Sequence, residues 1–79
     1  MDTFNRLISI FGSVFEDDID LNSVTVDSDL HDDIGINSIG LLYMAMAIEE
    51  EFNIKFVNDD FAEIKTINDV IKIIEKKVS

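Results

Sequence analysis

Apolar positions near the start of the chain recur with helical spacing. Between residues 4 and 15 they lie three or four residues apart, at Phe4, Leu7, Ile8, Phe11, Val14 and Phe15. This spacing places the side chains on one face of an α-helix, so the sequence predicts an amphipathic helix with Asp2 or Thr3 as its N-cap.

The last segment of the chain repeats this pattern, at Ile67, Val70, Ile71, Ile74 and Val78. Thr66 followed by Asp69 resembles a capping box, and Lys76 and Lys77 suit the negative end of a helix dipole. A second amphipathic helix is therefore predicted at the end of the chain.

The segment from Ile39 to Ile48 is apolar throughout except for Gly40, and it leads into three glutamates. Because Asn37 and Ser38 are good helix starters, we predict a helix from Ser38 to about Asn53. Helical geometry gives it two apolar stripes. The first stripe, predicted to face the core, contains Leu41, Met44, Ala45, Ile48 and Phe52, and the opposite stripe contains Ile39, Leu42, Tyr43 and Met46.

A small domain offers little to cover the second stripe, so we predict that it is a partner surface, with Glu49 and Glu50 beside it. The alternative is that the segment before it folds over this stripe as additional core. That segment, Glu16 to Asn37, mixes polar residues with single apolar ones and predicts a long ordered loop. Its apolar residues, expected to pin it to the core, are Ile19, Leu21, Val24, Val26 and Leu30.

Together with a short helical turn from Asp59 to Ile64, these elements predict an all-α fold. It is a small four-helix bundle of three main helices and one short helix, with a long loop between helices one and two. Its 79 residues make one domain, 1–79. The 47% apolar composition argues against disorder.

Charge narrows the possible partners. With 17 acidic and 6 basic residues, the net charge is −11, which would repel nucleic acid and anionic lipid but attract basic patches on proteins. The charge also favours a monomer. The chain has no cysteine and no apolar run long enough to span a membrane, and we therefore expect a cytoplasmic protein without a thiolate metal site.

Three stretches together resemble the acyl carrier protein family: "DLHDDIGINSIGLL", then "AIEEEFNIKF", then "IKTINDVIKII". The resemblance covers essentially the whole chain. It implies that Ser38 is the attachment site of 4′-phosphopantetheine, added by a phosphopantetheinyl transferase, and that the protein is a carrier and not an enzyme. It also implies that Asn37, Ile39, Leu42, Tyr43, Met46, Glu49 and Glu50 face that transferase and the acyl-loading and acyl-processing enzymes with basic patches.

The chain departs from the family pattern near the attachment site. Asn37 stands where the family usually has aspartate, and Gly40 and Tyr43 occupy positions that are often acidic in carriers of general fatty acid synthesis. Gly40 also adds backbone freedom after the attachment site. We therefore expect a carrier dedicated to a specialised acyl group in fatty acid, polyketide or other acyl metabolism. An aminoacyl or D-alanyl carrier, or an unmodified interaction module of the same shape, are the alternatives.

Two other functions have weaker support. A calcium loop starting at Asp27 would need glycine at its sixth position and glutamate at its twelfth, which hold Asp32 and Ser38. The single histidine, His31, has no cysteine partner and no spacing that indicates a catalytic triad. We therefore predict neither a metal site nor catalytic residues.

Overall fold

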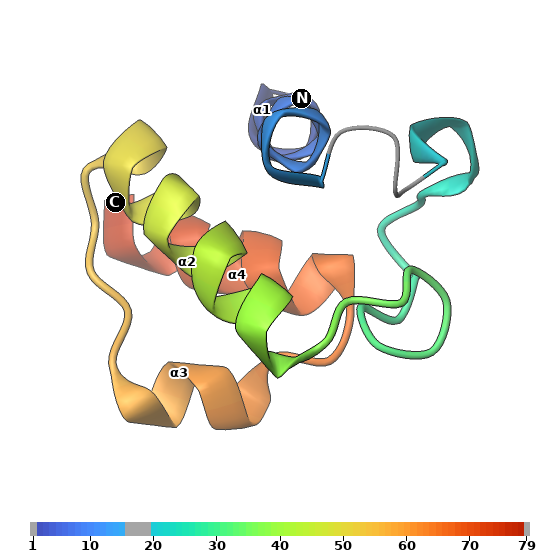
Figure 1. Ribbon diagram of the computed structural model, residues 1–79. Helices are drawn as coiled ribbons and strands as arrows, with labels where there is room; N and C mark the ends of the chain where they lie inside the picture. Colours follow the sequence, from blue (N-terminus) through green and yellow to red (C-terminus); the bar gives the residue numbers. More distant parts are fainter. Residues whose placement is uncertain (1, 16–19, 79) are drawn as a thin grey trace.

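The structure, a computed structural model, describes residues 2–15 and 20–78 and is built from helices (Figure 1). The described elements are α1 (Asp2–Phe15), the 3-10 turn η2 (Leu21–Ser23), α2 (Ser38–Phe52), α3 (Asn58–Glu63) and α4 (Ile67–Val78). The all-α prediction is confirmed, including the short third helix and, over its described residues 20–37, the long loop before α2. None of the described helices is both long and apolar enough to cross a membrane.

The ends of α2 and α4 follow from local sequence. At the start of α2, the Asn37 side chain accepts a hydrogen bond from the backbone N–H of Gly40 at 2.7 Å. The helix ends at Phe52 and is followed by its C-cap, Asn53, which adopts the left-handed conformation that asparagine tolerates (φ 57°). The capping box of α4 is confirmed, because Thr66 Oγ1 accepts from the N–H of Asp69 and Asp69 Oδ2 accepts from the N–H of Thr66.

The start of α1 differs from the prediction. The helix already includes Asp2, so Asp2 and Thr3 both lie in its first turn and neither precedes it as a cap. The N-terminal half of α1 is tied to the end of α2 by the side chain of Arg6. The guanidinium forms a salt bridge with the Glu51 carboxylate at 2.9 Å and lies 4.1 Å from the centre of the Phe52 ring.

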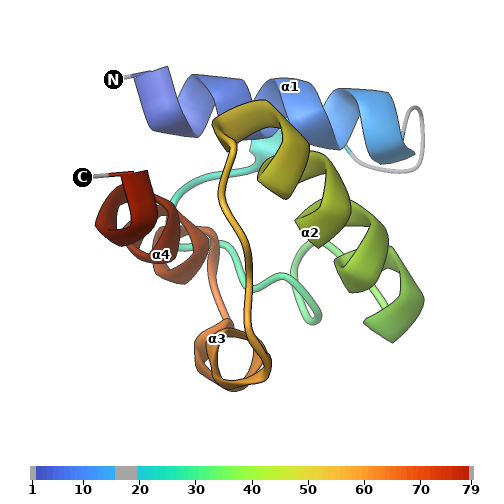
Figure 2. The ribbon, with the colours of Figure 1, turned by 90° about the vertical axis from the view of Figure 1, so that its left-hand side faces the viewer.

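The core lies where α1, α2 and α4 meet (Figure 2). Its fully buried side chains come from all three helices: Leu7, Phe11, Met44, Ile48, Ile67, Val70 and Ile74. Helices of 12 to 15 residues are marginal alone in water, so this shared apolar contact is what stabilises them. Lys77 of α4 also forms a 3.0 Å salt bridge with Asp60 of α3.

The loop before α2 is held by both side chains and backbone. Leu30 is buried and Val24 packs against the core, as predicted, but Val26 is 40% exposed and its predicted anchoring role is wrong. The carbonyl of Val26 holds the loop instead, accepting a 2.8 Å hydrogen bond from the N–H of Asn68. Ile19 and the side chain of Leu21 lie outside the described residues.

A short bridge completes the link between this loop and α4. Asp29 pairs with Thr66 as an isolated β-bridge, and the N–H of Leu30 donates to the carbonyl of Lys65 at 2.9 Å. The segment before α2 and the segment before α4 are thereby held side by side. Residues of both segments therefore lie close to Ser38, the first residue of α2.

Candidate functional site

Ser38 is exposed and forms the first residue of α2, directly after the cap Asn37. In the described part of the chain its hydroxyl makes no hydrogen bond, so it is free to react. No acidic side chain lies in the first turn of α2, where backbone N–H groups carry partial positive charge. An anionic group attached to this hydroxyl would therefore meet a favourable backbone field.

A cleft of about 320 Å³ opens beside Ser38. Its apolar part comes from the loop, α2 and the α3–α4 connection: Leu30, Ile36, Leu41 and Ile64. Its polar part includes His31 and Lys65. Lys65 was not predicted to lie near Ser38, because the two residues are far apart in sequence and are brought together by backbone contacts between the loop and the segment before α4, such as that of Leu30 with Lys65.

The acidic residues before Ser38 fold the loop. Asp29 Oδ1 accepts from the N–H groups of His31 and Asp32 at 2.8 Å, and Asp33 Oδ2 accepts from the N–H of Asp29 at 2.8 Å. The hydrogen bond from Asp32 is the main reason why the pKa of Asp29 lies below its ordinary value. No group of three or more possible metal ligands occurs within residues 2–15 and 20–78.

The second stripe of α2 is exposed. Ile39, Leu42, Tyr43 and Met46 are between 55% and 64% accessible, so the described part of the loop does not cover them. The alternative that the loop buries this stripe as core is therefore wrong. Glu50 lies beside the stripe, and a groove between α1 and α2 brings it together with Val14, Phe15, Tyr43 and Met46.

Glu49 differs from Glu50 in having a structural contact. Its carboxylate accepts a 2.7 Å hydrogen bond from the backbone N–H of Phe56 and so holds the connection between α2 and α3. Sequence reasoning placed both glutamates on a partner surface and missed this contact. The partner role of Glu49 stays a prediction, and one oxygen of its carboxylate already accepts the hydrogen bond from Phe56.

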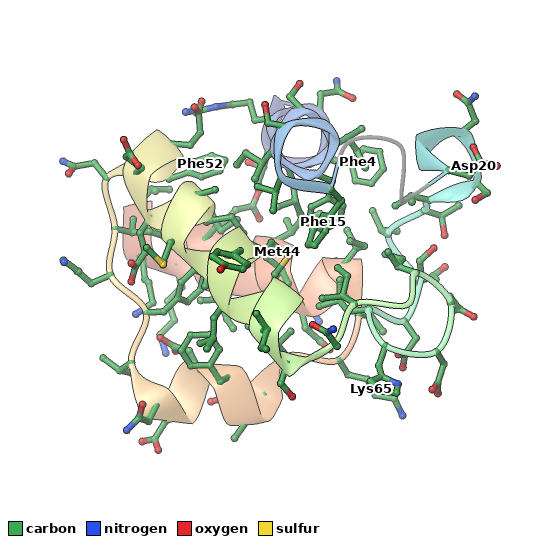
Figure 3. All side chains as sticks on the ribbon, viewed as in Figure 1. Phe4, Phe15, Asp20, Met44, Phe52 and Lys65 are labelled. Atoms are coloured by element: carbon green, nitrogen blue, oxygen red, sulfur yellow. The ribbon has the colours of Figure 1, made fainter. Side chains whose placement is uncertain are left out.

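Gly40 has a packing role that its sequence context does not reveal. A Cβ atom there would lie 3.1 Å from Phe15 Cε1 and 3.2 Å from Ile36 Cγ2. The absent side chain lets the end of α1 approach the start of α2, where Phe15 points under α1 toward the core (Figure 3). Close approach to these two side chains therefore gives a structural reason for this glycine.

Known proteins with this sequence pattern identify the family. The family model described as "Phosphopantetheine attachment site" matches residues 5–74. The chain belongs to the acyl carrier protein family. The acyl carrier protein of Bdellovibrio bacteriovorus is 34% identical over 75% of this chain and 76% of its own length. That of Phaeodactylum tricornutum is 33% identical over 95% of this chain and 96% of its own.

The fold agrees with this family. The solution structure of the apo doublet acyl carrier protein from prodigiosin biosynthesis superposes with a TM-score of 0.69. It is 21% identical, and the alignment covers 98% of this chain and 38% of that chain. This neighbour therefore supports the helical bundle of the carrier fold.

The cofactor follows from the family. Acyl carrier proteins are carriers, and the chain carries 4′-phosphopantetheine as a covalent group. The start of α2 fits such a group: the Ser38 hydroxyl is exposed, and the adjoining cleft offers an apolar wall and the basic side chains of His31 and Lys65. The group supplies a thiol, which this cysteine-free chain lacks.

Proposed function

We propose that this protein carries an acyl group as a thioester on 4′-phosphopantetheine attached to Ser38. The observation that carries the proposal is the free, exposed hydroxyl of Ser38 at the start of α2, beside a partly apolar cleft. Ser38 is a site of modification and no residue of the chain acts as a catalyst. The proposal extends to the whole chain as a single carrier domain, 1–79.

The attachment step needs a nucleophile and a transferase. Ser38 Oγ attacks the phosphorus of coenzyme A that bears the pantetheine, and a bond from this phosphorus to oxygen forms. The pyrophosphate bond breaks and adenosine 3′,5′-bisphosphate leaves, while the hydroxyl proton passes to a base on the transferase. The neutral cap Asn37 beside Ser38 leaves this step without a carboxylate from that position.

Partner docking is proposed for the exposed stripe of α2. Ile39, Leu42, Tyr43 and Met46 provide apolar contact, and Glu50 with the net charge of −11 suits basic patches on the transferase and on acyl-loading and acyl-processing enzymes. Apolar residues in the centre with acidic residues at the edge are a common arrangement of a transient interface. Asn37 and Glu49 belong to the proposed edge.

We further propose a dedicated carrier with its own enzymes, monomeric and cytoplasmic, and not the carrier of general fatty acid synthesis. The support is the low acidity of the first turns of α2, with Asn37, Gly40 and Tyr43 at its start. Equal acceptance of the loaded protein by a housekeeping malonyl transferase and ketosynthase would contradict this. Loading with an amino acid by an adenylating enzyme would identify an aminoacyl or D-alanyl carrier instead.

The intact mass tests the attachment. The purified protein is measured before and after incubation with coenzyme A and a broad-specificity phosphopantetheinyl transferase, alongside Ser38→Ala. Ser13→Ala, at an exposed serine of α1, is the matched control. We expect one phosphopantetheine on the wild type and on the control and none on Ser38→Ala. An unchanged wild-type mass with every transferase would favour an unmodified interaction module.

A further inference from the structure

Basic side chains are scarce in this protein, and one of them lies beside Ser38. Of the six basic residues, Arg6 is paired with Glu51 and Lys77 with Asp60. Lys65 lines the cleft that contains Ser38. Its ammonium group takes part in none of the salt bridges found in residues 2–15 and 20–78.

The backbone holds Lys65 in this place. Its carbonyl accepts the hydrogen bond from Leu30, its N–H donates to Asp69 Oδ2 at 3.0 Å, and the next residue, Thr66, pairs with Asp29. The backbone of Lys65 and of Thr66 is therefore held against the loop that leads into α2. Figure 3 shows the Lys65 side chain extending outward on this loop side.

The other charged groups of the cleft are already engaged. Asp29 accepts backbone hydrogen bonds from His31 and Asp32, although it also lies near enough to Lys65 for that charge to help lower its pKa. Asp32 lies 3.3 Å from His31 Nδ1. Lys65 is thus a cation of the cleft that forms no salt bridge with the described acidic residues, and His31 adds a ring nitrogen that can donate a hydrogen bond.

We propose that Lys65, assisted by His31, binds the phosphodiester formed on Ser38 and positions the base of the phosphopantetheine arm. A lysine ammonium is a compact charge suited to a phosphate oxygen. This inference rests on the proposed attachment to Ser38. It directs the base of the arm toward the α3–α4 connection, and so leaves the exposed stripe of α2 open to partners.

Phosphorus NMR of the loaded protein tests the contact, since the attached group contains the one phosphorus atom of the molecule. Wild type, Lys65→Met, Lys65→Arg and the control Lys55→Met, at an exposed lysine of the α2–α3 connection, are loaded with the same transferase. Intact mass verifies loading, and thermal unfolding verifies the fold. The transverse relaxation rate of the ³¹P signal then reports how firmly the phosphodiester is held.

We expect Lys65→Met to lower this rate by about twofold, because the freed group moves faster. Lys65→Arg and Lys55→Met should keep the wild-type rate at low salt. Raising the salt to about 1 M should bring the wild type toward Lys65→Met by screening. Loading should also shift the side-chain resonances of Lys65 and His31 more than those of Lys55.

Three results would overturn the inference. Equal ³¹P relaxation in loaded wild type and Lys65→Met would show that the lysine does not hold the phosphodiester. An equal change in Lys55→Met would show that only the total charge matters. A wild-type mass that no transferase changes would refute the attachment itself and this inference with it, whereas normal loading with unchanged relaxation refutes only the role of Lys65.

Discussion

The two faces of α2 have nearly the same chemistry and opposite surroundings. Met44 and Ile48 are fully buried, whereas Met46 is 64% exposed and Ile39 63% exposed on the same helix. The buried face meets α1 and α4, and the structure places no described element over the other face. Helical periodicity therefore separates the two faces, but the number of neighbouring helices decides which face becomes core.

The exposed face of α2 does not stabilise the isolated protein and is available for contact with another molecule. Apolar surface in water contributes nothing to folding, and contiguous apolar patches are typical of interaction sites. Ser38 begins the helix that bears this face, and Glu50 lies at its edge. Modification and recognition would thus occur on one side of one helix, with stability supplied from the other.

The largest expected difference concerns stability. Ile48→Ala should lower the free energy of unfolding by about 2–5 kcal/mol, since it leaves a cavity in the core, whereas Met46→Ala should change it by less than about 0.5 kcal/mol. Urea denaturation followed by circular dichroism measures both. A comparable loss for Met46→Ala would mean that the second face is covered in solution.

A substitution at Gly40 tests the close contact between the start of α2 and the end of α1. Gly40→Ala should destabilise the fold by about 1–3 kcal/mol through the contact with Phe15, offset by up to about 1 kcal/mol of better helix propensity. Combining it with Phe15→Leu should reduce the penalty, because the close Cε1 atom is removed. Stabilisation by Gly40→Ala alone, in the same denaturation experiment, would refute the packing role.

Docking tests the exposed face directly. Leu42→Ala should raise the KM of the phosphopantetheinyl transferase for this protein by about tenfold, as for a central interface residue, with kcat and unfolding free energy unchanged. Glu50→Gln should raise KM less, and its effect should fade with added salt. Ser13→Ala on α1 is the control. An unchanged KM for Leu42→Ala would remove this face from the transferase interface.

The smallest expected effect concerns the capping box at the start of α4, which lies outside both faces of α2. A hydrogen bond from the Thr66 N–H, opposed by partial desolvation and reinforced by the Lys65 N–H, lowers the pKa of Asp69. Because the folded pKa lies below the unfolded one, this stabilisation is complete above about pH 4 and is lost as the pH falls through the folded pKa.

Asp69→Asn should therefore cost about 1 kcal/mol, the usual value of a helix cap, at pH 7. The difference from wild type should shrink below about pH 4. Asp27→Asn, at an exposed loop position, is the control in urea denaturation from pH 7 to pH 3. A difference between wild type and Asp69→Asn that stays constant over this range would contradict the assignment.

The sequence by itself determined the local structure. The four helices, the capping box of Thr66 and Asp69, and the two stripes of α2 follow from spacing and capping within a few residues, where backbone geometry leaves few options. Ser38 as the candidate site came from family resemblance, since a serine at a helix start is otherwise unremarkable. The partner roles on α2 remain predictions.

Only the tertiary structure decided how separate segments meet. It exposed Val26, engaged Glu49 with the backbone of Phe56, set Phe15 against Gly40, and brought Lys65 into the cleft of Ser38. The contact of Phe15 with Gly40 and the cleft shared by Lys65 and Ser38 join residues far apart in the chain. The contact of Glu49 with Phe56 is closer in sequence, but it depends on how the α2–α3 connection turns back. Such contacts depend on the packing of the whole core, which no local pattern encodes.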